Sequence, residues 1–230
     1  MKKETYELLE NYMISCMEDS AHDKEHIYRV LFHALEIAQE ERDVDCDVLI
    51  AACLLHDIAR KEQFEDPSLC HALVGGEKAY TFMVNHGFEP AFAEQVKHCI
   101  QTHRFRKSLQ PESIEAKILF DADKLDATGA MGIARTLMFK ADGKQGIYSK
   151  LPNGEVSDGC EDTESTSFFR EYKFKLEKLY DKFYTEKAAQ MARQRQKIAA
   201  DFYEGLLAEV RGAYGFGRAT LQEHLQEDEI

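Results

Sequence analysis

The sequence predicts an all-α fold, a compact helical bundle in a single domain. Apolar residues recur at three- and four-residue spacing along most of the 230-residue chain, which is the period of amphipathic helices. No segment shows a clear period-2 alternation of Val, Ile and Thr, the pattern typical of half-buried strands. Proline is rare, with four residues. Since 44% of the residues are hydrophobic, a chain of this length can bury a full core.

Each expected helix combines an apolar face with residues suited to a helix end. Pro90 and Pro111 stand near the starts of two helices, and Gly87 and Gly212 follow the ends of two others. The third helix in order is the most apolar, so we expect it to be buried. The expected helices cover residues 5–17, 24–41, 45–60, 68–86, 90–103, 111–126, 128–140, 168–184 and 186–211.

The helical pattern fails over residues 141–165, where four glycines and one proline punctuate a polar run. At ~25 residues this loop exceeds the usual length of a structureless connection, which predicts a lid, a binding loop or a partly disordered segment. No linker composition separates two domains. The expected organisation is one domain over 1–212, with this loop at 141–165 and C-terminal helices at 166–212, followed by an acidic tail at 213–230.

Acidic residues outnumber basic ones by 42 to 29, which gives a net charge of −13. This balance argues against a protein that coats nucleic acid or an anionic membrane. No apolar run approaches the ~20 residues of a membrane span, and the first residues lack the apolar core of a signal peptide. We therefore expect a cytoplasmic protein with no membrane and no long nucleic acid as partner, in an oligomeric state that stays open. The six cysteines form no C-x-x-C pair and are expected to be reduced packing thiols.

A His-Asp pair at the end of an apolar run is the main candidate for a functional site. The run Ala-Ala-Cys-Leu-Leu at 51–55 leads directly into His56 and Asp57. A buried carboxylate that lacks a cation, a metal or a hydrogen-bonded partner costs roughly several kcal/mol in desolvation. Consecutive helical residues differ by about 100° in direction, so further ligands to a shared ion must come from other helices. The candidates are His26, near the start of the second helix, and Asp121, Asp123 and Asp126.

The order of these motifs resembles the H…HD…D pattern of the HD-domain metal-dependent phosphohydrolases. Further similarity at 129–135 and in the terminal helices points to the small bacterial HD hydrolases, which include nucleoside triphosphate pyrophosphohydrolases. The resemblance implies a helical bundle of the HD-domain type, with its metal-site core over about residues 20–140. The matching segments are His26-Ile-Tyr-Arg-Val, Leu-Leu-His56-Asp57-Ile and Asp121-Ala-Asp-Lys-Leu-Asp126-Ala.

Carried over to this chain, the resemblance implies one divalent metal ion held by His26, His56, Asp57 and Asp123. Asp126, one helical turn after Asp123, would instead orient a ligand or a water. Imidazole and carboxylate ligands together fit Mn, Mg, Fe, Co or Ni. Such a ligand set leaves positions open on the ion for water and a substrate oxygen, as a catalytic site requires.

The residues expected to take part in chemistry or to contact a phosphate are mostly cationic. Arg60 stands where other HD subgroups carry a glutamate as catalytic acid, so this chain offers a cation at that position. His103 is followed by Arg104 and Arg106. Catalytic roles are expected for Asp57, Arg60 and Lys124, and substrate contacts for Arg60, His103, Lys124, Arg29 and Arg135.

The function expected from the resemblance is hydrolysis of a small phosphorylated substrate, a nucleotide in the first instance, by attack of a metal-activated water on phosphorus. The enzyme would be a nucleoside triphosphate pyrophosphohydrolase or a nucleotidase. One alternative is a two-metal phosphodiesterase of cyclic or linear dinucleotides, in which His71, His98 and His103 would hold the second ion. The other alternative is a non-catalytic regulatory module that binds a nucleotide.

Overall fold

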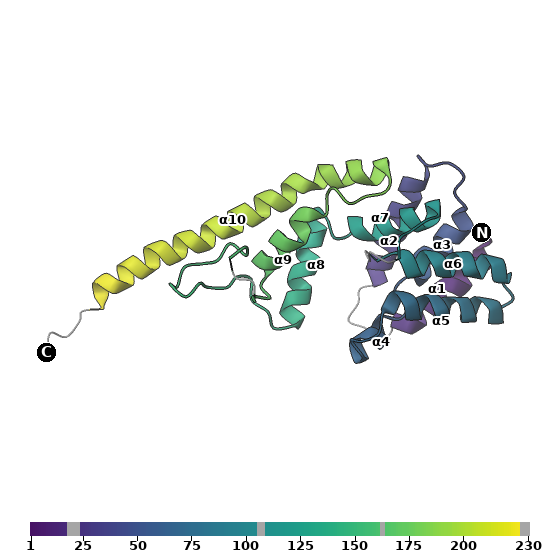
Figure 1. Ribbon diagram of the computed structural model, residues 1–230, viewed down its shortest axis with the longest axis horizontal. Coiled ribbons are helices and arrows are strands. Elements are labelled where there is room, and N and C mark those ends of the chain that lie inside the picture. The colour runs from purple at the N-terminus through teal and green to yellow at the C-terminus, as the bar shows by residue number, and fades with distance from the viewer. Residues whose placement is uncertain (18–23, 105–108, 162–163, 226–230) are drawn as a thin grey trace. The chain divides into compact units, whose positions relative to one another are not determined.

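The computed structural model is all-α, as the sequence predicts (Figure 1). It describes residues 1–17, 24–104, 109–161 and 164–225. Within these ranges helices are joined by turns and loops, and extended pairing is limited to one isolated antiparallel bridge between Lys150 and Val156. None of the described helices is both long enough and apolar enough to cross a membrane.

The contacts within the chain gather into two compact units. Unit 1 comprises Met1–Asp126 and Phe183–Gln190, and unit 2 comprises Ala127–Lys182 and Met191–Ile230. The expectation of one domain over 1–212 stays a prediction. All of the proposed metal ligands belong to unit 1, so the site can be described within that unit alone.

Unit 1 is a bundle of helices around one buried apolar helix, α3 (Cys46–Leu55) (Figure 1). Every residue of α3 from Ala51 to Leu55 is buried, and the helix contacts α1, α2, α5, α6 and α7. The high apolar content of this segment therefore reflects burial on all sides, as the sequence predicts. The surrounding helices are α1 (Lys3–Met17), α2 (Lys24–Ala38), α4 (Arg60–Glu65), α5 (His71–Asn85), α6 (Pro90–Thr102) and α7 (Ile114–Leu125).

The expected helix over 45–60 is wrong at its end, because α3 stops at Leu55. His56 to Ala59 form a turn, and a new short helix, α4, begins at Arg60. A continuous helix would direct adjacent side chains about 100° apart. The turn releases His56 and Asp57 from that constraint, and both side chains then face the same space.

The starts of α3 and α7 are fixed by capping side chains. The Asp45 carboxylate accepts hydrogen bonds from the backbone N–H groups of Asp47 and Val48, and the Ser113 hydroxyl accepts one from the Ala116 N–H. The Asp45 N–H donates to the Glu115 carboxylate at 2.8 Å, which joins the two helix starts. These two helices, which lead to His56 and carry Asp123, are thus anchored at the end far from the site.

Asp121 anchors the segment that precedes the long last helix, α10 (Glu186–His224), to α7. Its carboxylate is fully buried and accepts hydrogen bonds from the backbone N–H groups of Tyr184 and Thr185 and from the Thr185 hydroxyl, at 2.7–3.0 Å. These bonds satisfy a carboxylate that would otherwise be costly to bury. Asp121 therefore has a structural role, and its neighbour Asp123 is free for the site.

Unit 2 contains α8 (Gly129–Asp142), α9 (Phe168–Phe174), the short 3₁₀ helix η1 (Leu176–Lys178) and most of α10. The expected helix over 168–184 is wrong, since it breaks after Phe174. Tyr172 stacks on Tyr203 of α10 with ring centroids 4.2 Å apart, and Phe169 meets the edge of Tyr203. These aromatic residues pack the core of unit 2.

The last helix continues past Gly212, where the sequence predicts its end, to His224. A glycine C-cap requires a positive φ. Gly212 does not adopt one, because the positive-φ glycines of the described residues are Gly87, Gly129, Gly154 and Gly159. The acidic tail over 213–230 is therefore helical over most of its length, and residues 226–230 lie outside the described part.

The Gly-rich segment between α8 and α9 contacts α10 through backbone acceptors. Arg211 donates to the Val156 carbonyl at 3.1–3.2 Å, and the Tyr203 hydroxyl donates to the Asp158 carbonyl at 2.6 Å. These bonds give the segment an ordered path in unit 2. Its role as a lid stays a prediction, and residues 162–163 lie outside the described part.

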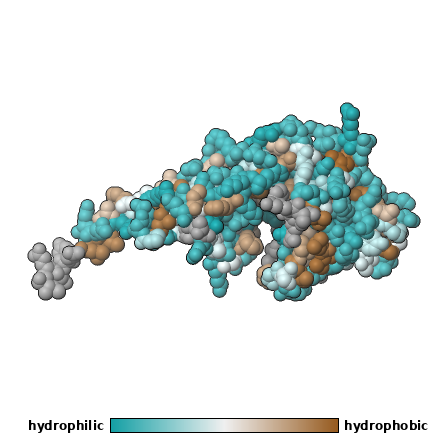
Figure 2. Space-filling model, in the orientation of Figure 1, coloured by the Kyte–Doolittle hydropathy of each residue, from teal (hydrophilic) through white to brown (hydrophobic). Residues whose placement is uncertain are grey.

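Most of the surface seen in Figure 2 is hydrophilic, with apolar side chains scattered over it. Phe64 and Met138 are among the exposed large apolar residues, at 83% and 68% exposure. Scattered apolar side chains are normal on a folded protein. The surface agrees with the acidic composition of the chain.

Loss of the α7 cap should weaken the fold without touching the site. Because the Ser113 hydroxyl satisfies an otherwise unpaired N–H, Ser113→Ala should lower the free energy of unfolding by ~1 kcal/mol. Urea denaturation followed by circular dichroism measures this. Ser15→Ala is the matched control, since Ser15 is exposed inside α1 and its hydroxyl donates to the Tyr12 carbonyl of the same helix. Equal stability of the two variants would contradict the capping role.

Candidate metal centre

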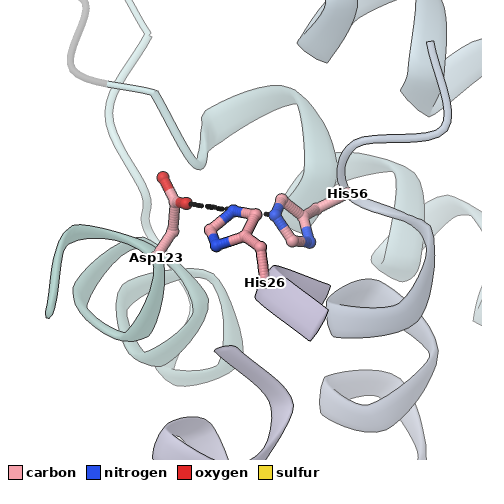
Figure 3. Close-up of side chains that lie close together, drawn as sticks. All are labelled: His26, His56 and Asp123. Carbon is pink, nitrogen blue, oxygen red and sulfur yellow. Dashed lines mark ion pairs between the residues drawn. The ribbon is translucent and has the colours of Figure 1, made fainter. Parts of the chain in front are cut away.

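Three elements of unit 1 bring His26, His56 and Asp123 together (Figure 3). His26 lies in the first turn of α2, His56 directly follows α3, and Asp123 lies near the end of α7. Their ligand atoms lie within 4.8 Å of one another. Asp123 Oδ1 is 3.2 Å from His26 Nε2 and 3.9 Å from His56 Nε2. The structure thus assembles three of the four side chains that the sequence predicts as metal ligands.

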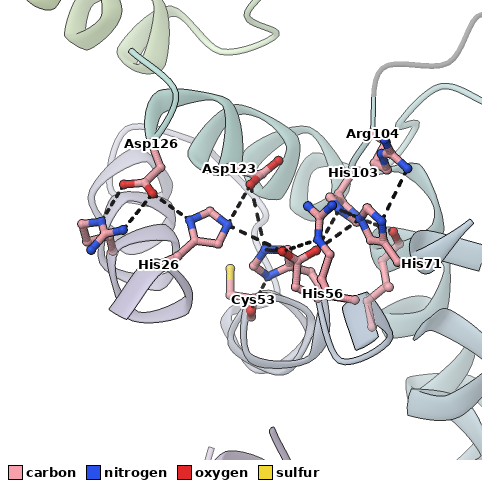
Figure 4. Close-up of polar contacts among 12 residues, drawn as sticks. His26, Cys53, His56, His71, His103, Arg104, Asp123 and Asp126 are labelled. Carbon is pink, nitrogen blue, oxygen red and sulfur yellow. Dashed lines mark hydrogen bonds and ion pairs between the residues drawn. The ribbon is translucent and has the colours of Figure 1, made fainter. Parts of the chain in front are cut away.

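In Figure 4, His56 lies between His26 on one side and two further histidines, His71 and His103, on the other. The fourth predicted ligand, Asp57, contacts both sides. Its Oδ2 is 3.8 Å from His26 Nε2 and 3.7 Å from His56 Nε2. Its Oδ1 is 3.3 Å from His71 Nε2 and 3.7 Å from His103 Nε2. The two oxygens of one carboxylate therefore face two adjacent sets of imidazole nitrogens.

Asp57, His71 and His103 form a second group whose ligand atoms lie within 4.8 Å of one another. All three residues are buried. His71 Nε2 and His103 Nε2 lie 3.4 Å apart. His98, which the sequence suggests beside them, belongs to neither group, and its carbonyl instead accepts the hydroxyl of Thr102. The pattern of a second ligand set is therefore present, with Asp57 in place of His98.

Each of the four histidines uses Nδ1 for a hydrogen bond at the rim of the cluster, so that Nε2 points inward. A carbonyl or an ionised carboxylate only accepts, which requires a proton on the Nδ1 that faces it. The amide of Gln63 donates to the Leu69 carbonyl, so its oxygen faces His71. The acceptors are the Cys53 carbonyl for His56 (2.7 Å), the Ile100 carbonyl for His103 (2.6 Å), the Gln63 amide oxygen for His71 and the Asp126 carboxylate for His26 (2.7 Å).

Two buried atoms of the cluster, His56 Nε2 and Asp57 Oδ1, have no hydrogen-bond partner in the described structure. Both are acceptors, and leaving a buried polar group unpaired costs about 1–3 kcal/mol, more for a charged one. A divalent cation would satisfy imidazole nitrogen and carboxylate oxygen together. The residues present therefore fit a bound metal ion.

Burial and nearby charges shift the pKa of His26 in one direction and the pKa of the other three histidines in the opposite direction. Burial lowers the pKa of His56, His71 and His103, the last to about 3. Burial also lowers the pKa of His26, but the hydrogen bonds with Asp123 and Asp126 outweigh it and raise that pKa to about 9. Three of the imidazoles are thus held in the neutral form that a metal ion requires.

The two carboxylates that face the centre are held in the ionised form. Burial raises the pKa of Asp57, but Arg60 and His56 outweigh it, and the pKa falls well below its usual range. Burial likewise raises the pKa of Asp123, and the hydrogen bond from His26 outweighs it and lowers that pKa. The centre therefore offers two anionic oxygen ligands beside neutral nitrogen ligands.

The cationic residues predicted from the sequence occupy different places. Arg60 Nε lies 2.9 Å from Asp57 Oδ2, so Arg60 belongs to the centre. The Lys124 ammonium lies over the Phe120 ring, 3.5 Å from its centroid. Arg135 is part of α8 in unit 2. Its predicted contact with substrate stays a prediction, and Arg106 lies outside the described residues.

Sequence reasoning missed the groups that hold the histidines from behind. Gln63 precedes His71 by eight residues, and no periodic or motif signal connects them. The Cys53 and Ile100 carbonyls are backbone groups, which carry no sequence signal, although each lies three residues before its histidine. The Arg29 guanidinium pairs with Asp126 at 2.7 Å, which the sequence did not indicate, and its expected contact with substrate stays a prediction.

Comparison with protein families and with curated proteins gives a consistent match. A family model described as HD domain matches residues 24–128. The chain is 31% identical over 199 residues to the uncharacterized protein YpgQ of Bacillus subtilis (strain 168). That alignment covers 85% of this chain and 87% of YpgQ.

Solved structures show the same likeness. The crystal structure of B. subtilis YpgQ in complex with ADP has a TM-score of 0.69 and 28% identity, covering 90% of this chain and 98% of that chain. An HD-superfamily hydrolase from Bacillus thuringiensis has a TM-score of 0.68 and 27% identity, covering 91% and 98%. A predicted HD-superfamily hydrolase from an uncultured Thermotogales bacterium has a TM-score of 0.58 and 30% identity, covering 88% and 91%.

Binding of a divalent ion should stabilise the parent protein, because the ion satisfies the unpaired atoms of the folded state only. With Mn²⁺ at 100 times its dissociation constant, the expected gain is ~2.7 kcal/mol. Thermal unfolding with and without Mn²⁺ measures it as a rise in Tm. His56→Ala should abolish most of the rise.

His86→Ala is the matched control for this measurement. His86 is exposed at the end of α5, where its Nδ1 bonds the Phe82 carbonyl. This variant should keep the full Mn²⁺-dependent rise in Tm. A parent whose Tm does not respond to Mn²⁺, Mg²⁺, Fe²⁺, Co²⁺ or Ni²⁺ would refute the metal centre.

Proposed function

The chain belongs to the HD-domain family, and from that premise we propose that it is a metal-dependent phosphohydrolase that acts on a nucleotide. The observation that carries this proposal is the group of His26, His56 and Asp123, with the Asp57 carboxylate beside it and with His56 Nε2 and Asp57 Oδ1 as unpaired buried acceptors. A bare structural core gives no reason to bury two carboxylates among imidazoles. A hydrolytic metal site gives such a reason, because both kinds of side chain bind the ion.

The four side chains would hold one ion, Mn, Mg, Fe, Co or Ni, through two imidazole nitrogens and two carboxylate oxygens. When bound, such an ion polarises a phosphoryl oxygen and activates a water for attack on phosphorus. The protein would hold the ligands in place through the Nδ1 hydrogen bonds, which fix each ring before the ion arrives. Burial of His56 and Asp57 excludes bulk water from the inner side of the site.

Cations beside the cluster support a phosphorylated substrate. Arg60 is held against Asp57 and brings a guanidinium to the edge of the centre, where negative charge on phosphate oxygens would be stabilised. Arg104 lies near the second group, with Nη1 3.4 Å from His71 Nδ1. We assign phosphate contacts to Arg60, His103 and Lys124. The net charge of −13 favours a small ligand at such a local basic spot over a long nucleic acid.

A nucleotide is the proposed substrate class because a similar protein, B. subtilis YpgQ, has been crystallised in complex with ADP. The reaction that fits the family resemblance is removal of pyrophosphate from a nucleoside triphosphate, or removal of phosphate by a nucleotidase. Both place a phosphoryl group at the metal centre. They differ in which phosphorus is attacked, and the products distinguish them.

Product analysis with defined metals tests the proposed function. The purified protein, incubated with nucleoside mono-, di- and triphosphates and each divalent ion, should release pyrophosphate or phosphate, and a chelator should stop the release. Asp123→Ala should lower turnover at least ~100-fold, since even groups that only support a ligand contribute 10–100-fold. His86→Ala should retain parental turnover. Ligand-dependent stabilisation without any product would instead favour a nucleotide-binding regulatory module.

A second candidate function, a two-metal phosphodiesterase of dinucleotides, is favoured by the group Asp57, His71 and His103. Two-metal sites use ions about 3.5–4 Å apart. The two oxygens of Asp57 would then bind one ion each. Metal analysis of fully loaded protein decides between the two, because a value near one ion per chain excludes this alternative. In the two-ion case His71→Ala should lower the value from two to one.

A further inference from the structure

Among the four histidines of the centre, His26 differs in the group that accepts its Nδ1–H. The other three donate to neutral oxygens, two backbone carbonyls and one amide. His26 donates to the carboxylate of Asp126 at 2.7 Å. We propose that Asp126 is a positioning residue of the metal centre, which fixes the His26 ring so that Nε2 faces the ion, and that Arg29 holds Asp126 in place. This proposal rests on the proposed metal centre.

The Asp126 carboxylate accepts hydrogen bonds from His26 and from Arg29. Asp126 is 1% exposed, and its Oδ2 accepts from both His26 Nδ1 and Arg29 Nη2, the latter at 3.1 Å. Its Oδ1 accepts from Arg29 Nε at 2.7 Å. Two parallel bonds from a guanidinium fix the plane of a carboxylate, and the carboxylate in turn fixes the imidazole.

Two elements supply all the groups involved. His26 and Arg29 lie three residues apart in α2, on neighbouring positions of one helix face. Asp126 directly follows α7, three residues after Asp123, and its N–H donates to the Asp123 carbonyl at 3.2 Å. The end of α7 therefore holds His26 from both sides, with Asp123 at Nε2 and Asp126 at Nδ1.

A charged partner changes what His26 offers to a metal. A carboxylate that accepts the Nδ1–H raises the basicity of Nε2, which strengthens the bond to a cation. Arg29 neutralises Asp126, so this carboxylate adds no unbalanced charge to the buried site. The predicted contact of Arg29 with substrate stays a prediction beside this pairing. His26 becomes the most strongly donating imidazole of the centre.

Metal affinity tests the positioning role without any measurement of activity. In Mn²⁺ titrations followed by electron paramagnetic resonance of the free ion, Asp126→Asn should weaken binding by about 10–100-fold, the range for groups that orient a ligand. Arg29→Gln should also weaken Mn²⁺ binding, by a smaller factor. Ser113→Ala is the matched control, because it destabilises the same helix α7 by loss of its cap and leaves the cluster intact. Affinity in Asp126→Asn equal to that of this control would overturn the proposal.

A second measurement on metal-free protein keeps the test independent of the proposed function. Nuclear magnetic resonance should show a His26 Nδ1–H proton that exchanges slowly with water in the parent and in Ser113→Ala, and rapidly in Asp126→Asn. A parent that binds no Mn²⁺ would contradict the proposed function, while the ring proton would still show whether Asp126 holds His26. If Asp126→Asn does not fold, Asp126→Glu displaces the carboxylate instead, and unchanged Mn²⁺ affinity in that variant would overturn the proposal equally.

Discussion

The structure of unit 1 depends on one electrostatic constraint, a buried space into which four imidazole nitrogens and two carboxylates point. Lone pairs that face one another without a proton or a cation between them repel, and desolvation adds to the cost. The chain balances part of this cost internally, through Arg60 on Asp57 and through the proton shared between His26 and Asp123. The unpaired atoms on His56 and Asp57 remain, and they define where a cation would be most stabilised.

Packed helices and backbone hydrogen bonds hold the ligand side chains in place around this buried polar space. The apolar helix α3 is buried on all sides and ends one residue before His56. Asp45 and Ser113 fix the far ends of α3 and α7, and backbone carbonyls hold His56 and His103 from behind. Because each ring is fixed before an ion binds, little conformational entropy remains to be lost on binding. Preorganisation of this kind is what the local sequence around each ligand provides.

Most of the fold follows from the sequence, since helical periodicity and end signals are local properties. The apolar run at 51–55 predicts the buried helix, and the fold class is confirmed. The end of that helix was predicted wrongly, because the break at His56 results from interactions of the His-Asp pair with other helices. The break after Phe174 and the continuation of α10 beyond Gly212 were missed as well. Beyond Gly212, Tyr214 meets the edge of Tyr148, and tertiary contacts of this kind can outweigh local helix signals.

In the candidate site too, some features could be predicted from the sequence and others could not. The assembly of His26, His56, Asp57 and Asp123 is as the motif order predicts, and their role as ligands stays a prediction. The supporting contacts could not be read from the sequence, because Gln63 and the carbonyls at Cys53 and Ile100 belong to no motif. Arg29 shows the limit most clearly. Only three-dimensional proximity reveals that its charge is already balanced by Asp126.

Because Asp57 contacts both ligand groups, the binding of a metal ion to one group changes the net charge that an ion or a phosphate group meets at the other. Asp57 and Asp123 together carry two negative charges, which Arg60 and a protonated His26 balance in the metal-free protein. A divalent ion that replaces the His26 proton already leaves the buried space with a net positive charge. A second divalent ion at His71 and His103 would add two more positive charges in a region of low dielectric. A phosphate group would be the natural counter-charge. If a second ion binds at all, its affinity and that of a phosphorylated ligand are therefore coupled, and each is raised by the other to the same degree.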